Sequence, residues 1–167
     1  MKKRLLPIML TTWLAILAAC SQKANDRSYK IMLKGLLRHD VHEIDVATAV
    51  KDSSSIFLDA REKAEFEVSQ IRGAQWIGYN NFDLNSVKSI AKDQPIIVYC
   101  SVGYRSEKIA EKLVAAGYQS VSNLYGGIFS WVNEGQAVYR NNIATNDLHA
   151  YSSFWGKWLR KGNKVYE

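Results

Sequence analysis

The sequence predicts an α/β fold in which a mostly parallel sheet of five strands carries helices on both faces. Short apolar segments typical of strands alternate along the chain with helical segments, which is the pattern of a parallel sheet joined by crossover helices. The segment Ile96–Tyr99 is apolar without interruption, as expected of a strand that is covered on both faces. With 167 residues and 47% hydrophobic composition, the chain is long enough for one domain with a sizeable core, but hardly for two.

Residues 1–19 have the pattern of a secretory signal. A positive start at residues 2–4 is followed by an uncharged stretch over residues 5–19. This stretch is shorter than the ~20 residues that cross a bilayer as a helix, so a permanent membrane span is the weaker interpretation. It ends in small residues followed by Cys20, which resembles a bacterial lipobox and implies cleavage before Cys20 and lipid on its sulfur. A signal peptide with a chance cysteine at its edge is the alternative.

This leader predicts an exported protein that is anchored to a membrane through lipid on Cys20 and tethered by residues 20–28. Ser21 after the cysteine favours the outer membrane facing the periplasm of a Gram-negative cell, and the surface of a Gram-positive cell stays open. Cys100 would then be the single unmodified thiol in a compartment where thiols tend to be oxidised. An unpaired cysteine in that setting calls for a functional reason.

The composition argues against several other classes of protein. The formal charge is +6, but without residues 2–4 the chain has 19 basic and 16 acidic residues, and the remaining +3 does not suggest nucleic-acid binding. Two cysteines and histidines without ligand spacing argue against a metal site, and no other cofactor is expected. The histidines are expected on the solvated surface rather than as general bases; they are His39, His42 and His149.

The secondary-structure elements can be assigned in order along the chain. Residues 29–37 place apolar side chains at i, i+3, i+4, i+7 and i+8, which predicts an amphipathic helix. Five strands are then expected over residues 43–46, 55–58, 74–77, 96–99 and 121–124. Helical segments are expected over residues 47–51, 62–69, 84–91, 106–116 and 127–132. Pro95, Gly117 and Gly135 follow the last three of these segments and stop them.

The candidate site lies where the fourth strand ends. Ligands of open α/β sheets bind at the carboxyl ends of the strands, and Cys100 follows this strand directly, with a loop over residues 101–105 and a helix from Ser106 behind it. Such a loop can aim several backbone N–H groups at the sulfur, and the helix dipole adds positive charge, which together favour a reactive thiolate. Gly103 permits a tight or left-handed turn, and Arg105 offers a cation to an anionic substrate. The alternative is that Cys100 is a small hydrophobic residue at the end of a buried strand.

Five short motifs occur in the order and spacing of a known family. They are Leu-Asp-Ala-Arg at 58–61, Glu-Phe at 65–66, Ile-Arg-Gly-Ala at 71–74, Cys-Ser-Val-Gly-Tyr-Arg-Ser at 100–106, and Leu-Tyr-Gly-Gly-Ile at 124–128 followed by Trp131 and Gly135. Over residues 41–139 the chain resembles a single-domain rhodanese. The resemblance implies a three-layer α/β sandwich and transfer of sulfane sulfur through a persulfide. The donor is an anion such as thiosulfate, or a persulfide, and the acceptor is a thiol or a cyanide-like nucleophile.

By the same resemblance, Cys100 is the nucleophile and the backbone amides of the following loop cradle its persulfide. The residues of this loop are Ser101, Val102, Gly103, Tyr104, Arg105 and Ser106. Two departures from the family pattern are visible. Gln70 stands where members often have His, and the loop lacks the additional basic residues that some thiosulfate-using relatives carry beside the cysteine. The second departure argues against thiosulfate as the physiological donor.

Asp59 and Arg61 are expected to support the site without taking part in catalysis. Both follow the strand over residues 55–58, at the sheet edge where Cys100 lies. Two interpretations of Asp59 carry equal weight. It either pairs with Arg105 or with loop amides and fixes the shape of the loop, or it forms a salt bridge within its own turn.

Other functions stay open at this point. On a related scaffold, phosphatases and arsenate reductases have five residues between cysteine and arginine, whereas this chain has four between Cys100 and Arg105. A smaller ring of N–H donors suits a sulfur atom better than a tetrahedral oxyanion. The domain could also be a catalytically silent binding module, or Cys100 could exchange disulfides with periplasmic partners. The sequence leaves protein partners and oligomeric state undetermined.

Residues 140–167 lie beyond the resemblance. Their aromatic and apolar side chains follow helical spacing beside basic residues, at Tyr151, Phe154, Trp155, Trp158 and Leu159. The favoured interpretation is a strap packed on the domain of residues 29–139. The alternatives are contact with the membrane surface near the lipid anchor, or a lid or docking surface for the acceptor.

Overall fold

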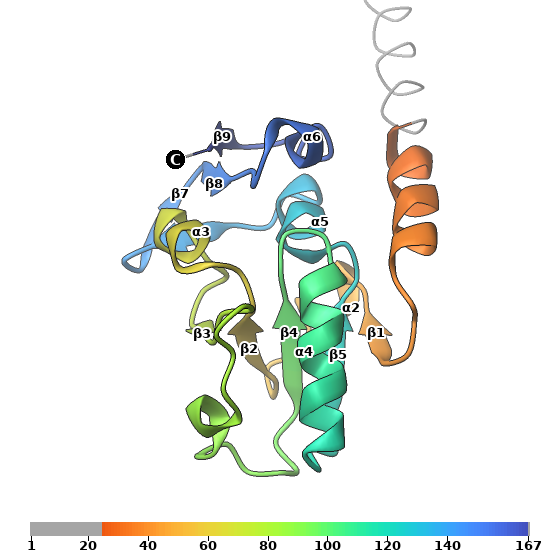
Figure 1. Ribbon diagram of the computed structural model, residues 1–167. Coiled ribbons are helices and arrows are strands. Elements are labelled where there is room, and N and C mark those ends of the chain that lie inside the picture. Colours follow the sequence, from red (N-terminus) through yellow and green to blue (C-terminus); the bar gives the residue numbers. More distant parts are fainter. Residues whose placement is uncertain (1–24, 167) are drawn as a thin grey trace, which may run out of the picture. The chain divides into compact units, whose positions relative to one another are not determined.

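The computed structural model describes residues 25–166 and shows an α/β fold built on a five-stranded sheet (Figure 1). All neighbouring strands of this sheet run parallel, in the order β1-β5-β4-β2-β3, which confirms the predicted fold class. The strands are β1 (His42–Ile44), β2 (Ile56–Asp59), β3 (Gln75–Trp76), β4 (Ile96–Tyr99) and β5 (Val121–Leu124). The helical segments among them are α2 (Val46–Ala49), α3 (Lys63–Val68), the 3-10 helix η1 (Leu84–Val87), α4 (Tyr104–Ala115) and α5 (Gly127–Asn133).

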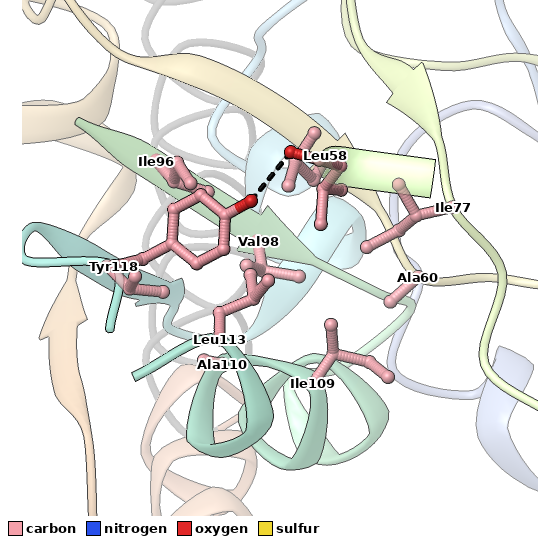
Figure 2. Close-up of a cluster of buried hydrophobic side chains, with 11 residues drawn as sticks. Leu58, Ala60, Ile77, Ile96, Val98, Ile109, Ala110, Leu113 and Tyr118 are labelled. Atoms are coloured by element: carbon pink, nitrogen blue, oxygen red, sulfur yellow. Dashed lines mark hydrogen bonds between the residues drawn. The ribbon is translucent and has the colours of Figure 1, made fainter. Parts of the chain in front are cut away.

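Helix α4 covers one face of the sheet. Leu58 of β2 and Val98 of β4 point to this face and belong to one buried cluster with Leu113 of α4 (Figure 2). Tyr118 closes the cluster, and its hydroxyl donates a hydrogen bond to the backbone oxygen of Val87 at 2.6 Å. Burial of a large apolar side chain contributes roughly 1.5–3 kcal/mol, so this cluster holds β4 firmly in place.

Helix α5 lies against the opposite face. Side chains alternate across a strand, so Phe57 and Tyr99 point away from α4. The ring of Phe57 contacts Tyr99 and Trp131 of α5 edge-on, with centroids 6.4 and 5.6 Å apart. The middle strand β4 is therefore buried on both faces, as its unbroken apolar sequence predicts.

Most predicted elements are present with ends shifted by one or two residues, but one prediction is wrong. The α-helix expected over residues 84–91 is only the single turn η1. Its polar side chains bind nearby backbone instead of leaving it free to continue the helix: the Asp83 carboxylate accepts the N–H of Asn85, and the Ser86 hydroxyl donates to the backbone oxygen of Asp83.

The chain divides into two compact units, one up to Gly35 and one from Leu36 onward. In the first unit the described residues are helical from residue 25, in agreement with the amphipathic spacing. The predicted signal peptide and the lipidated Cys20 fall on residues 1–24, outside the described residues. Within residues 25–166, no helix combines the length and the apolar character needed to cross a membrane.

The C-terminal extension contains strands that the sequence did not predict. Here β6 (Val138–Arg140) pairs antiparallel with β7 (Ile143–Thr145), and β8 (Asp147–His149) pairs parallel with β9 (Asn163–Val165). The aromatic stripe forms only one helical turn, α6 (Ser153–Gly156). Strands of three residues are too short to show an alternating pattern, which explains the omission.

Hydrogen bonds from two helical regions fasten the extension to the domain. The hydroxyl of Ser69, after α3, donates to the backbone oxygen of Asp147 at 2.6 Å. The Asn133 side chain at the end of α5 donates to the backbone oxygen of Trp158 at 2.8 Å and accepts the N–H of Arg160 at 2.7 Å. These contacts support the interpretation of the extension as a strap packed on the domain.

Candidate functional site

Cys100 borders a cavity of about 330 Å³ at the carboxyl end of β4. It is a free thiol and only 1% exposed, so a reagent has to reach its sulfur through this cavity. Four of the residues that follow Cys100 and were predicted to form the site also line the cavity: Ser101, Val102, Tyr104 and Arg105. The structure thus brings most of the predicted site residues together around the sulfur.

Gly103 makes the direct contact between the loop and the sulfur. Its backbone N–H donates to the Sγ of Cys100 at 3.1 Å. This geometry requires φ of +109°, in the left-handed region that favours glycine, and Gly103 at the same time caps the N-terminus of α4. The helix consequently starts at Tyr104, two residues earlier than predicted.

Asn123 of β5 fixes the loop from behind, a role that the sequence did not reveal. Its side-chain amide donates to the backbone oxygen of Gly103 at 3.0 Å. The hydroxyl of Ser106 donates to the Asn123 carbonyl oxygen at 2.7 Å and lies 3.1 Å from the same Gly103 oxygen. Ser106 therefore shapes the loop with its side chain, and it is fully buried rather than part of the cavity wall.

The N-terminus of α5 packs directly on the backbone of the cysteine loop. The N–H groups of Ile128 and Phe129 donate to the backbone oxygens of Cys100 and Ser101 at 2.9 and 3.1 Å. A Cβ atom at Gly127 would lie 2.3 Å from the Cys100 oxygen, so only glycine permits this approach. The double glycine noted in the sequence motif thus has a physical reason.

Arg105, which was expected to offer a cation to an anionic substrate, lines the cavity but is paired with Glu65. Its Nη1 and Nη2 donate to the two carboxylate oxygens of Glu65 at 2.6 and 2.8 Å, and Nη2 also donates to the Ser101 hydroxyl at 2.9 Å. Glu65 is held in turn by the N-terminus of α3, where it accepts the N–H of Glu62 at 3.0 Å. In the sequence, Glu65 was noted only as part of the Glu-Phe motif, and its pairing with Arg105 was not predicted.

The Arg105–Glu65 pair is stable as an ion pair. Burial alone would raise the pKa of Glu65, but the hydrogen bonds and charge of Arg105 lower that pKa below its ordinary value. Burial likewise opposes the charge of Arg105, but the hydrogen bonds to Glu65 and the electrostatic interactions with Cys100 and Glu65 raise its pKa. Both side chains therefore remain charged at neutral pH.

Asp59 and Arg61 form the salt bridge within their own turn, which decides between the two interpretations of Asp59. The Nη2 of Arg61 lies 2.6 Å from the Asp59 carboxylate, and both side chains are fully buried. The same nitrogen donates to the backbone oxygen of Ser69 at 2.7 Å. This pair fixes the connection from β2 through α3 and does not border the Cys100 cavity.

The expectation of solvated histidines holds for His39 and His42, which are exposed, but it is wrong for His149. His149 is the last residue of β8 and is buried. The Nδ1 of His149 accepts the N–H of Tyr151 at 3.0 Å. Burial lowers the pKa of His149, and the nearby positive charges of Arg61 and Arg105 act in the same direction. The neutral imidazole thus holds the backbone of the extension.

Two side chains of the extension complete the cavity wall. Tyr151 and Trp155 line the same cavity as Cys100. The guanidinium carbon of Arg105 lies 4.9 Å from the centroid of the Tyr151 ring. Their positions could not be predicted, because a backbone reversal at Tyr151, with φ of +64°, interrupts the helical spacing.

Comparison with known sequences agrees with this geometry. Residues 44–134 match the family model described as Rhodanese-like domain. Similar curated proteins are named tRNA uridine(34) hydroxylase: that of Listeria welshimeri is 34% identical over 88 residues, and that of Bacillus cereus is 33% identical over 92 residues. These matches cover 50% and 52% of this chain but 28% and 29% of the relatives, so this chain spans less than a third of their length.

Solved structures show the same fold. A rhodanese-related protein of Thermoplasma volcanium superposes with a TM-score of 0.55 at 27% identity, over 59% of this chain and 98% of that one. A protein of Bacillus halodurans gives 0.56 at 25% identity, over 71% and 88% of the two chains. The thiosulfate sulfurtransferase of Pseudomonas aeruginosa gives 0.54 at 22% identity, over 71% of this chain and 23% of that one, which is evidence for the fold alone.

Proposed function

The chain belongs to the rhodanese-like domain family, and from that membership we propose that it is a sulfurtransferase in which Cys100 carries the transferred sulfur as a persulfide. The Cys100 thiolate attacks the outer sulfur of a donor, the bond between that sulfur and the donor breaks, and the remainder of the donor leaves with the electron pair. A thiolate or cyanide-like acceptor then attacks the terminal sulfur and releases the Cys100 thiolate. Each half-reaction exchanges one bond for another, so no external oxidant or reductant is required.

The hydrogen bond from the Gly103 N–H to the Cys100 sulfur carries this proposal. A fixed N–H donor stabilises negative charge on the sulfur without the reorganisation that water would need. The cavity beside the thiol leaves room for a second sulfur atom. We propose that further backbone amides of residues 101–106 bind that terminal sulfur when it is present.

A mass measurement on the full chain tests the proposal. The chain carries Cys20→Ser, which leaves Cys100 as the single thiol, and it is purified in detergent. Incubation with a sulfane-sulfur donor should raise the intact mass by one sulfur atom, and cyanide should remove it. The matched variant Cys100→Ser should show no adduct. If several donors give no adduct, the domain is a binding module. If Cys100 instead forms mixed disulfides with periplasmic proteins in cells, a thiol-redox role replaces sulfur transfer.

The names of the sequence relatives do not extend to this chain as a whole. The relatives are called tRNA uridine(34) hydroxylase, but the matched region is less than a third of each of them. We therefore assign no hydroxylation or tRNA binding to this chain. Without residues 2–4 the charge of the chain is +3, which gives no sign of nucleic-acid binding.

The cellular location is a second part of the proposal and rests on the leader sequence. We propose export and lipid attachment at Cys20, which would place Cys100 in the periplasm or at the cell surface. Metabolic labelling with a radioactive fatty acid should mark the wild-type protein and leave Cys20→Ser unlabelled. Label on the Cys20→Ser variant, or none on the wild type, would contradict the anchor.

A further inference from the structure

We propose that Tyr151 and Trp155 select the sulfur compound that reaches Cys100, and that this compound carries an aromatic or similarly flat apolar group next to its reactive sulfur. The inference rests on the sulfurtransferase function proposed above and names the substrate class for that site. Both residues lie outside the matched family region of residues 44–134. The selection is therefore a property of this chain's own extension.

The wall that these two residues form is held in place by surrounding contacts. The Tyr151 ring lies against the Arg105 guanidinium, 4.9 Å from its central carbon. The Trp155 ring is partly buried and is packed edge-on by Phe154, with centroids 5.4 Å apart. Two flat side chains thus face the cavity that holds the thiol, one packed on Arg105 and the other on Phe154.

The backbone of this wall is also constrained. Tyr151 has φ of +64°, a conformation that a bulky residue adopts only when its surroundings impose it. Its N–H donates to the Nδ1 of His149, and the Ser152 hydroxyl accepts the N–H of Trp155 at the start of α6. The backbone reversal and these two hydrogen bonds fix the course of the chain from β8 into α6, the segment that carries both aromatic residues.

The charges at the cavity disfavour a small dianion. The Glu65 carboxylate binds both terminal nitrogens of Arg105, the cation that lines the cavity. Glu62 places a carboxylate in the cavity wall itself. A dianion such as thiosulfate would meet a compensated guanidinium and a carboxylate, which provides little attraction.

The size and character of the cavity favour an organic molecule. Its volume of about 330 Å³ lies in the range of pockets for organic ligands, roughly 300–1,000 Å³. Tyr79, Val102 and Tyr104 contribute further apolar surface beside the two residues of the extension. Flat rings contact an aromatic group edge-on or offset-stacked, and such contacts change an affinity by about 2- to 10-fold each.

Two donors with the same reacting bond and charge test this selection. Benzenethiosulfonate and methanethiosulfonate are both monoanions that carry an outer sulfur on a sulfonyl group. The Cys100 thiolate attacks that sulfur, the sulfur–sulfur bond breaks, and benzenesulfinate or methanesulfinate leaves with the electron pair. Stopped-flow mixing followed by intact-mass analysis of the full chain with Cys20→Ser gives the rate of persulfide formation with each donor.

The wild-type ratio of the two rates, phenyl over methyl, is the reference for the variants. Trp155→Leu should lower this ratio about 3- to 10-fold, and Trp155→Phe should lower it less because a flat ring remains. Tyr166→Leu is the control, since it removes an exposed ring of the extension that does not line the cavity and should keep the ratio. A Trp155→Leu ratio within about 2-fold of the wild type would overturn the inference.

A second measurement needs no variant and so does not depend on folding of Trp155→Leu. Benzenesulfinate should slow alkylation of Cys100 by iodoacetamide at lower concentration than methanesulfinate does, because its ring occupies the aromatic wall. Equal protection by the two sulfinates would count against the selection. If neither thiosulfonate produces a persulfide on the wild-type chain, the proposed sulfurtransferase function fails first, and this result is distinct from equal rates with both donors.

Discussion

Two arginine–carboxylate pairs of the domain are built alike but lie in different surroundings. Arg61 binds Asp59 and Arg105 binds Glu65, each with a nitrogen–oxygen distance of 2.6 Å. Both side chains of the first pair are fully buried, whereas the Arg105 side chain is 12% exposed and borders the cavity of Cys100. One arginine–carboxylate pair therefore lies wholly inside the fold, whereas the other places a partly neutralised guanidinium at the wall of the Cys100 cavity.

An aromatic ring accompanies each pair and extends the comparison. The Arg61 guanidinium lies 5.6 Å from the Tyr99 ring in the core, and the Arg105 guanidinium lies 4.9 Å from the Tyr151 ring of the extension. Burial raises the pKa of Tyr99 well above its ordinary value, so this tyrosine stays neutral within the sealed pair. The two pairs thus share their residue types and differ in their position relative to the cavity.

Breaking the sealed pair should have the largest effect. Asp59→Ala leaves the Arg61 charge buried without its partner, which typically costs about 3–5 kcal/mol of the free energy of unfolding. Urea denaturation followed by circular dichroism measures this loss. Within residues 25–166 the Nη1 of Arg61 has no hydrogen-bond partner, so the pair is only partly satisfied. The double variant Asp59→Leu/Arg61→Met should recover more than half of the loss, and a loss below about 1 kcal/mol for Asp59→Ala would show that the pair is not structural.

Breaking the pair at the cavity should change the rate more than the fold. Glu65→Gln keeps the acceptor for the Glu62 N–H but removes the charge that compensates Arg105. The free guanidinium should then attract thiosulfate and raise its rate of sulfur transfer to Cys100 about 10-fold at low salt, with a steeper decrease as salt is added. Persulfide formation followed by mass measures the rate. An unchanged rate and salt dependence would mean that Glu65 does not set the charge seen by the donor.

The two pairs also show what the sequence can and cannot predict. Asp59 and Arg61 are two positions apart, so a salt bridge within their turn was one of two predicted arrangements. Glu65 and Arg105 are 40 positions apart, and a glutamate in the first turn of a helix is adequately explained as a capping residue, which it also is. A pairing over that distance follows from the assembled sheet and not from local spacing.

The parallel sheet and the cysteine loop were predictable because local signals determine them. An unbroken apolar strand, a glycine and a helix start place Cys100 at the sheet edge, and all three are visible in the sequence. The aromatic wall was not predictable. Helical spacing in the extension suggested a longer helix, but the hydrogen bond from the Tyr151 N–H to the buried His149 reverses the backbone instead.

Acid should separate the contributions of His149 and Glu65. Burial lowers the pKa of His149 below 6.5, so the unfolded chain binds the proton first and stability falls as the pH drops below about 6.5. The lowered pKa of Glu65 stabilises the fold fully above 4.5, and this contribution is lost as the pH falls through the folded-state pKa.

Urea midpoints between pH 7.5 and pH 4 measure this dependence. In the plot of urea midpoint against pH, His149→Gln should reduce the loss of stability that begins below about pH 6.5. Glu65→Gln should reduce the loss that begins below about pH 4.5. The charge of Glu65 raises the pKa of His149, so Glu65→Gln should also lower the His149 midpoint in an NMR titration. A His149 midpoint that stays the same in Glu65→Gln would show that the two groups are not coupled.

The smallest effect is expected from the ring beside Arg105. Tyr151→Leu removes the contact between ring and guanidinium, which at a partly exposed site contributes about 0.5–1 kcal/mol to the free energy of unfolding. Tyr151→Phe keeps the ring and should retain most of that stability. Position 151 has a left-handed backbone, which glycine would relax. Neither variant introduces glycine there, so both keep the backbone strain of the wild type. Urea denaturation therefore compares the ring alone: a loss above about 2 kcal/mol for Tyr151→Leu would place the ring in the core, like Tyr99, and not at the wall of the cavity.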